Sequence, residues 1–165
     1  MFDHLYKLLS FFRQTQMISG RKKLQKMVYL LQHYGLDLEM NYVYHHYGPY
    51  SAGLQAEVEE LVESGFVAEG KTCRGYEYHI TEKGIEFLQK LEEEFEVPKI
   101  SMNDKQLDLL GQQSSQFLEV VSTYAFLLAK DYLPEQAVEK VKELKPHLAD
   151  YVDEARAFYD VVATE

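Results

Sequence analysis

The chain has 165 residues, of which 46% are hydrophobic and 27% are charged. This balance is typical of a folded globular protein and excludes a disordered or collagen-like chain. The formal net charge of -10 opposes unspecific binding to a polyanion, and no apolar stretch approaches the ~20 residues of a membrane-spanning helix.

Two further features of the composition bear on cellular location. Cys73 is the only cysteine, so no disulfide can form within the chain. The first residues contain an early acidic residue and lack a small-residue cleavage site, which favours an amphipathic helix over a signal peptide. We therefore expect a cytoplasmic protein that does not bind membranes.

The first two expected elements are helices. Apolar residues recur at i, i+3, i+4 and i+7 between positions 5 and 12, which predicts a helix over roughly residues 2–15. The Ser19-Gly20 pair interrupts the pattern, and Ser19 is expected to cap a second helix over residues 21–34.

An aromatic segment and a third helix come next. Residues 42–47 are rich in aromatic residues and lack helical punctuation, which predicts an extended segment. In such a segment Tyr42, Tyr44 and His46 would share one side, with Val43, His45 and Tyr47 on the other. Gly48-Pro49 is expected to break the extended conformation, because proline lacks an N–H donor. Ser51 is then expected to cap a third helix that ends near residue 64.

A β-hairpin and a fourth helix complete the first part of the chain. Residues 66–69 and 76–80 read as strands, with residues 70–75 as a polar loop bounded by glycines. Thr81 is expected to cap the following helix. Together these elements predict a mainly α fold with a small β-hairpin, namely a winged-helix-type domain over residues 1–96.

The remaining residues, 97–165, predict a C-terminal helical segment of three helices. The pattern indicates helices over residues 103–131, 134–144 and 148–162, with proline opening the second one. Apolar stripes at residues 117–128 and 151–162 need cover, so we expect this segment to pack on the domain or to form a homodimer interface.

Two motifs carry a resemblance to known families. The run YEYHITEKGIEFLQKL at positions 76–91 resembles the last wing strand and following helix of winged-helix proteins. The run RKKLQKMVY at positions 21–29, with YGPYS at 47–51, resembles the YwgA-like family of uncharacterised bacterial proteins. It is also distantly similar to Panacea-type domains of some antitoxins and proteolysis adaptors. The resemblance covers residues 15–95 and implies a fold rather than an activity.

Basic residues provide two candidate contact surfaces. The basic patch lies at the start of the second helix and consists of Arg21, Lys22, Lys23 and Lys26. The predicted wing carries Lys71 and Arg74. The third helix, which would enter the major groove in a winged-helix protein, is instead acidic, and its carboxylates would repel DNA. The basic patch reads either as a solvated helix end or as a site for phosphates or an acidic protein surface.

The aromatic segment, from Tyr42 to Tyr50, is a further candidate surface for a partner. Aromatic side chains give a large contact area at low entropic cost and are enriched at interfaces. The same residues could equally complete a small core. The candidate partner-binding residues are Tyr42, Tyr44, His46, Tyr47 and Tyr50.

No catalytic or metal-binding motif is recognisable. The six histidines are scattered without zinc-ligand spacing, and the chain lacks phosphate-binding glycine loops and a nucleophile elbow. We expect no cofactor, no metal and no enzymatic activity. The sequence favours a regulatory or adaptor protein that binds a protein partner or itself, and the alternative is a DNA-binding transcriptional regulator.

Overall fold

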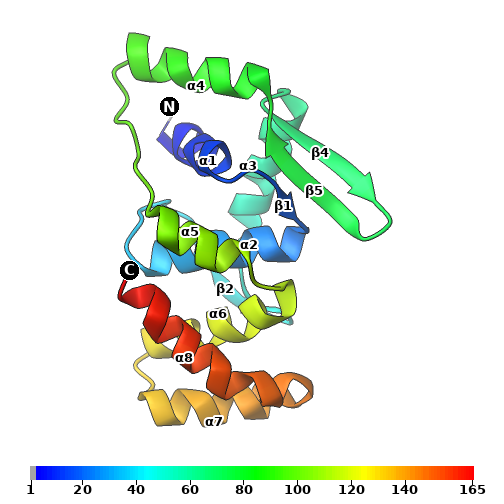
Figure 1. Ribbon diagram of the computed structural model, residues 1–165, viewed down its shortest axis with the longest axis vertical. Helices are drawn as coiled ribbons and strands as arrows, with labels where there is room; N and C mark the ends of the chain where they lie inside the picture. Colours follow the sequence, from blue (N-terminus) through cyan, green and yellow to red (C-terminus); the bar gives the residue numbers. More distant parts are fainter. Residues whose placement is uncertain (1–2) are drawn as a thin grey trace.

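The computed structural model describes residues 3–165, which form a mainly helical structure with two small antiparallel sheets (Figure 1). The molecule is elongated, with α4 at one end and α7 at the other. The elements of the first part are α1 (Asp3–Gln14), β1 (Ile18–Ser19), α2 (Arg21–His33), β2 (Val43–His45), β3 (Gly48–Tyr50), α3 (Ala52–Glu63), β4 (Val67–Thr72), β5 (Gly75–Ile80) and α4 (Glu82–Glu94). Those of the second part are α5 (Asp104–Gly111), α6 (Ser115–Ala129), α7 (Pro134–Leu144), the 3-10 helix η1 (Pro146–Tyr151) and α8 (Val152–Ala163).

The first four predicted helices are confirmed within one or two residues at their described ends, and residue 2, the expected start of the first, lies outside the described residues. Ser51 caps α3 as predicted, since its Oγ accepts a hydrogen bond from Leu54 N at 3.1 Å. The prediction that Ser19 caps α2 is wrong. Ser19 pairs with Glu77 in a strand, and Gly20 is the N-cap with a φ of 101°.

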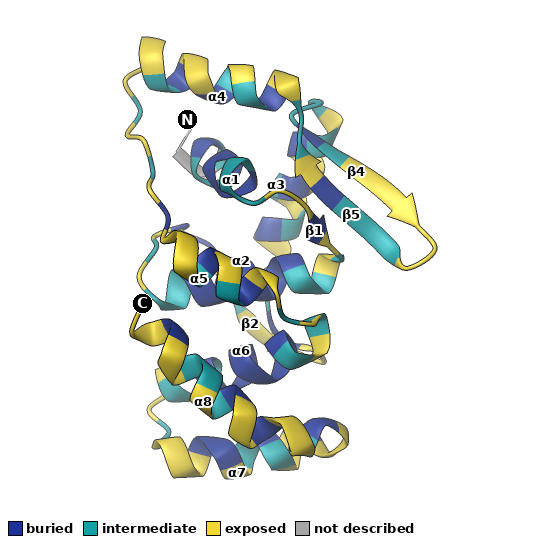
Figure 2. Cartoon of the chain, viewed as in Figure 1, coloured by how far each residue is buried: buried dark blue, intermediate teal, exposed yellow. Residues whose placement is uncertain are grey.

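A three-stranded sheet in the order β1-β5-β4 contains the predicted hairpin, here called the wing. Its strands are longer than expected, because pairing continues to Thr72 and Gly75 and leaves only Cys73 and Arg74 in the turn. Thr72 Oγ1 stabilises this turn by accepting from Arg74 N at 3.2 Å and donating to the Gly75 carbonyl at 3.1 Å. Strand β4 is exposed from Glu69 to Thr72, whereas β5 is mostly half-buried (Figure 2).

The Thr-x-x-Gly motif that joins the wing to α4 has a structural explanation. Thr81 Oγ1 donates to the Gly65 carbonyl at 2.6 Å and accepts from Gly84 N at 3.0 Å, so one hydroxyl caps α4 and anchors the preceding turn. A Cβ at Gly84 would overlap the Phe66 carbonyl oxygen. Glycine is therefore required here for close contact between α4 and the start of the wing.

The aromatic segment forms a second hairpin, β2–β3, whereas the sequence predicted one extended run ended by Gly48-Pro49. Both residues belong to β3, where Pro49 lies opposite Tyr44 and Gly48 opposite His45. Gly48 has a φ of 93°, and a Cβ there would lie 2.8 Å from Thr123 Oγ1 on α6. The glycine therefore permits both the turn and the close approach to α6, instead of ending the strand.

The C-terminal helices differ from the prediction in one place. The expected helix over residues 103–131 is interrupted after Gly111, and Ser114 starts a new helix by accepting from Phe117 N at 3.1 Å. Helix α7 has the predicted bounds, and Pro146 opens η1 before α8 begins at Val152.

Helix α6 lies at the centre of the half of the molecule that contains α7 and α8 (Figure 1). It packs against α2, β3, α7 and α8. Its apolar stripe and most of that of α8 are buried within the chain, while Tyr151 and Val161 stay exposed, so most of the apolar area that predicted a dimer interface is covered by the chain itself. One continuous hydrophobic cluster runs through both parts of the chain. The boundary between residues 1–96 and 97–165 stays a prediction.

None of the helices within residues 3–165 has the length and apolar composition needed to cross a lipid bilayer.

Candidate binding pocket

A pocket of about 340 Å³ opens where α2, α3 and the β2–β3 hairpin meet. It brings together two candidate surfaces that the sequence analysis treated separately: three members of the basic patch and two tyrosines of the aromatic segment. Its lining residues are Arg21, Lys22, Gln25, Lys26, Tyr47, Tyr50, Gln55 and Glu59.

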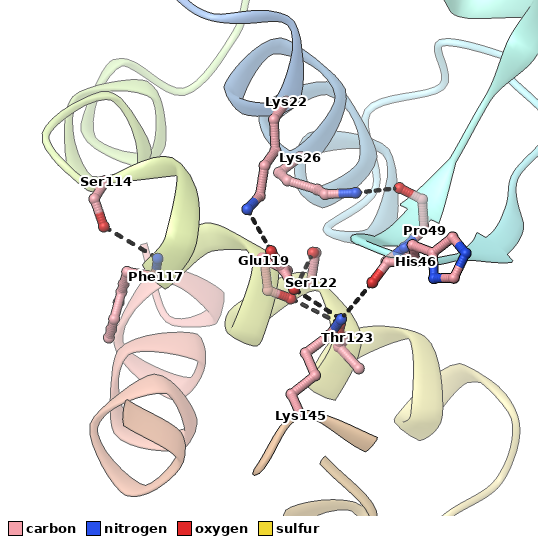
Figure 3. A network of polar contacts seen from close by, with 10 residues as sticks. All are labelled: Lys22, Lys26, His46, Pro49, Ser114, Phe117, Glu119, Ser122, Thr123 and Lys145. Atoms are coloured by element: carbon pink, nitrogen blue, oxygen red, sulfur yellow. Dashed lines mark hydrogen bonds and ion pairs between the residues drawn. The ribbon is translucent and has the colours of Figure 1, made fainter. Parts of the chain in front are cut away.

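Lys26 is the most buried cation of the pocket, with 2% of its surface exposed. Its Nζ donates a hydrogen bond of 2.6 Å to the Pro49 carbonyl, which the β2–β3 ladder leaves available (Figure 3). Burial lowers the pKa of Lys26 to about 8, and the nearby Lys22 and Lys145 act in the same direction while Glu119 opposes them. Lys26 thus holds β3 against α2, although burial and the neighbouring lysines disfavour its charged form.

Beneath the pocket, Glu119 of α6 forms ion pairs with two lysines from distant parts of the chain. One carboxylate oxygen contacts Lys22 of α2, and the other lies 2.8 Å from Lys145 Nζ. Lys145 also donates to the His46 carbonyl at 3.1 Å. Burial acts to raise the pKa of Glu119, but the two ammonium groups outweigh it and hold that pKa below its usual value. The network joins α2, α6, the start of η1 and the turn of the hairpin (Figure 3).

Glu119 and Lys145 were not among the site residues predicted from the sequence. A signal was present, because Glu119 is the only charged residue of α6, a helix otherwise made of apolar and small polar residues. A lone carboxylate within an apolar stripe needs a buried partner. The sequence gives no indication that the partners are Lys22 and Lys145.

Gln25 connects α2 to Ser51, the residue that caps α3, and so forms one wall of the pocket. Its side chain makes two hydrogen bonds of 2.9 Å with the backbone of Ser51, donating to the carbonyl and accepting from the N–H. Together with the Lys26–Pro49 bond, this contact explains how the Leu-Gln-Lys run and the later Gly-Pro-Tyr-Ser run act as one unit. The α2 side chains bind the backbone of the second motif directly.

Arg21 links the pocket to the wing. Its guanidinium lies 3.9 Å from the centre of the Tyr76 ring, and its Nε donates to the Tyr78 hydroxyl at 3.2 Å. Tyr78 in turn donates to Glu69 at 2.6 Å. Burial, together with this bond to Glu69, raises the pKa of Tyr78 to about 12 even though Arg21 opposes the shift.

The other members of the two predicted surfaces lie elsewhere. Lys23 points away from the pocket, lines a different cavity and donates to the Gly111 carbonyl at 2.5 Å. Tyr42 packs against Tyr29, with ring centres 4.8 Å apart, and Tyr44 packs 5.7 Å from the Phe126 ring. Tyr42 and Tyr44 therefore both face the helices, as predicted, whereas His46, the third residue expected on that side, lies in the exposed turn.

His46 lies in the exposed turn of the hairpin and contributes its backbone carbonyl to the network. Tyr47, the next residue, has 62% of its surface exposed, and Lys22 Nζ lies 4.9 Å from the centre of its ring. The aromatic segment is therefore divided: one part is packed against helices and the other borders the pocket.

The wing cations Lys71 and Arg74 are exposed near the tip of the β4–β5 hairpin and do not line the pocket. On α3, Glu59, Glu60 and Glu63 are exposed, as expected for an acidic third helix. Cys73 lies in the exposed wing turn as a free thiol. In the part of the chain that the structure describes, no three His, Cys, Asp or Glu side chains come together as a metal site would require.

Fold and pocket together define a mainly helical protein with a cationic, aromatic-rimmed pocket beside its second helix. No family model matches the chain. The chain is 33% identical over 161 residues to Uncharacterized protein YwgA of Bacillus subtilis (strain 168), and the match covers 93% of each chain. The protein belongs to the YwgA-like family.

Proposed function

We propose that this protein is a non-enzymatic regulatory or adaptor protein of the cytoplasm, which binds a partner protein at the pocket between α2, α3 and the β2–β3 hairpin. The observation that carries the proposal is the position of Tyr47. A large aromatic ring that is 62% exposed lies beside Lys22, on a hairpin held by buried hydrogen bonds and ion pairs. Exposed aromatic residues on a rigid support are the usual anchors of protein interfaces.

The scaffold of this adaptor is a winged-helix-type domain, followed by a C-terminal helical segment that supports it. The order of α1, β1, α2, α3, β4 and β5, with a three-stranded sheet in the order β1-β5-β4, supports this assignment. The β2–β3 hairpin is then an insertion between the second and third helices of the domain. The Thr81–Gly84 junction after the last wing strand agrees with it.

Site-specific photo-crosslinking tests the adaptor proposal. A benzoylphenylalanine placed at Tyr47 is expected to crosslink one reproducible partner in cells of the source organism. The matched control carries the same group at Tyr151, which is also an exposed tyrosine, with 42% of its surface accessible. The same products from both positions, or none from position 47, would contradict binding at the pocket.

The second candidate function, a DNA-binding regulator, is favoured by the exposed cations Lys71 and Arg74 on the wing. The exposed carboxylates of α3 and the net charge of -10 oppose it. Fluorescence anisotropy of a labelled random duplex at low and near-physiological salt decides between the two. A salt-sensitive rise that charge reversal at Lys71 and Arg74 abolishes would support the regulator.

Self-association as a homodimer is a third form of partner binding. The apolar stripes of α6 and α8, which predicted it, pack mostly inside the chain and leave little apolar surface for a second copy. Light scattering at micromolar concentration is expected to give the mass of one chain, and twice that mass would restore the dimer.

A further inference from the structure

The pocket carries more positive than negative charge. Arg21, Lys22 and Lys26 line it, against the single carboxylate of Glu59. Below the floor, the charge of Lys145 balances that of Glu119. We propose that the group which enters this pocket is a carboxylate of an extended peptide, either an acidic side chain or a chain terminus, with an apolar residue beside it. This inference rests on the proposed adaptor function and specifies the chemistry of the partner.

The ammonium of Lys26 has hydrogen-bonding capacity left for such a ligand. An ammonium has three N–H donors, and within the described residues the Pro49 carbonyl is the acceptor that Lys26 Nζ contacts. Gln25 is different, because both ends of its amide are occupied by Ser51. Lys22 is also accessible from the pocket, since 27% of its side chain is exposed although Nζ pairs with Glu119. The two ammonium groups therefore supply the donors for a carboxylate, and Gln25 supplies a fixed wall.

The shape and the rim of the pocket favour a carboxylate attached to an apolar group. The rings of Tyr47 and Tyr50 border the cavity and offer faces for an aliphatic or aromatic side chain. A volume of about 340 Å³ is at the small end of ligand pockets and suits one or two side chains.

The acidic groups near the pocket disfavour a more highly charged ligand. Glu59 lies on the rim, and Glu69 is within 3.8 Å of Arg21. Together with Glu119 they place three carboxylates against the four cations Arg21, Lys22, Lys26 and Lys145, so the net charge of the site is about +1. A phosphate dianion or a nucleic acid backbone would exceed this charge. The excess of positive charge is therefore matched to a monoanion.

The test is a titration of the ¹⁵N-labelled full chain with short peptides, followed by amide chemical shifts. The first pair is acetyl-Phe-Glu-Leu amide and its Gln counterpart, which is neutral and of the same shape. The second pair is acetyl-Phe-Leu with a free terminus and its amide. At least one acidic probe is expected to shift the amides of Lys22, Tyr47 and Tyr50 and to bind about fivefold more tightly than its neutral match. The pair in which the acidic peptide binds more tightly shows whether the pocket takes a carboxylate of a side chain or of a chain terminus.

Variants assign the effect to the pocket. Lys22→Gln is expected to weaken the acidic probe about fivefold, while Lys23→Gln, a change of the next residue on the same helix but outside the pocket, leaves affinity within about twofold. Lys26→Met is not used alone, because loss of the Pro49 contact could disturb the hairpin. Equal binding of acidic and neutral probes, no binding of any probe, or equal effects of Lys22→Gln and Lys23→Gln would overturn the carboxylate proposal.

The two proposals fail in different ways. If Tyr47 crosslinks a partner but the acidic and neutral probes bind equally, the adaptor function stands and the carboxylate chemistry falls. If the acidic probes bind at the pocket and no protein crosslinks at position 47, the carboxylate site stands and the adaptor function falls.

Discussion

The two hairpins of this protein are held in different ways. The wing is built from six-residue strands, and backbone pairing and a local threonine turn define it out to its exposed tip. The β2–β3 hairpin has three residues in each strand, too few to be stable alone. Lys26 and Lys145 bind its backbone from α2 and from the start of η1, and Gln25 holds Ser51, the residue that follows β3. The outer part of the wing is thus held by pairing between its own two strands, whereas the short hairpin depends on buried charges from distant parts of the chain.

The strongest test of this difference is the substitution Glu119→Gln. It leaves Lys22 and Lys145 without their shared counter-charge in a buried site, and we expect the free energy of unfolding to fall by about 3 to 5 kcal/mol. Urea denaturation followed by circular dichroism measures the loss. The control is Glu143→Gln, which removes an exposed carboxylate paired with Lys140 and is expected to change stability by less than about 0.5 kcal/mol.

Hydrogen exchange locates the effect of the same variant. Amides of the β2–β3 hairpin are expected to lose protection in Glu119→Gln, while those of β4 and β5 keep theirs relative to the rest of the molecule. Equal loss in both hairpins would show that the network does not distinguish them.

A smaller loss is expected from adding one methyl group to a glycine. Gly48→Ala places a Cβ at a φ of 93° and 2.8 Å from Thr123 Oγ1, so we expect a loss of about 2 to 3 kcal/mol. Gly70→Ala on the wing is the matched control, since a Cβ there meets no atom within 4 Å. Similar midpoints for the two variants in thermal or urea denaturation would contradict the close packing of β3 on α6.

The pH dependence of stability offers a third test. The pKa of Lys26 is about 8 in the folded protein against an ordinary value of 10.5, so the unfolded chain binds more protons between these values and stability rises with pH. From pH 7.5 to 9.5 we expect a gain of about 2 kcal/mol in the free energy of unfolding from this residue. The charged groups that face Lys26 are Lys22, Glu119 and Lys145.

The change Lys26→Met removes the group that titrates. Its urea midpoint is expected to vary less with pH than that of the unmodified protein over the same range. Because burial also lowers the pKa of Lys23, Lys23→Gln serves as the comparison and should remove only part of the slope. An unchanged slope in Lys26→Met would contradict the assignment.

The smallest effect on stability is expected at the wing tip. Lys71→Glu and Arg74→Glu change exposed residues of a hairpin held by its backbone, so the free energy of unfolding should stay within about 0.5 kcal/mol. Urea denaturation of the double variant checks this. A larger loss would show that the tip is held by contacts of these side chains.

Most of the helices could be predicted from the sequence, because their signals are local. Apolar spacing, Ser51 and Thr81 as caps and Pro134 as an opening residue define them within a few positions. The break after Gly111 was missed although Ser114 is a local cap, while two other errors arose where long-range pairing prevails over local preference. Ser19 belongs to a strand because it pairs with Glu77 of β5. Gly48 and Pro49 belong to β3 because Lys26 binds the Pro49 carbonyl and Gly48 packs closely against α6.

The pocket was predictable only in its parts. The basic patch and the aromatic segment were both identified, but helical periodicity does not show that Lys22 and Lys26 face Tyr47 while Lys23 does not. The buried partners Glu119 and Lys145 come from elements more than 90 residues further along the chain than these lysines, and no local pattern relates them. Tertiary contacts, rather than composition, decide which members of each cluster share a site.

The position of Cys73 has a practical consequence. The only thiol of the chain lies in the exposed wing turn, outside the pocket lining, and the chain contains no tryptophan. A maleimide dye therefore attaches at one known place without any substitution, and a tryptophan introduced at Tyr47 would be the only one in the molecule. A single substitution thus gives one optical reporter on each hairpin, so the motion of the wing and that of the pocket rim can be followed separately in the same molecule.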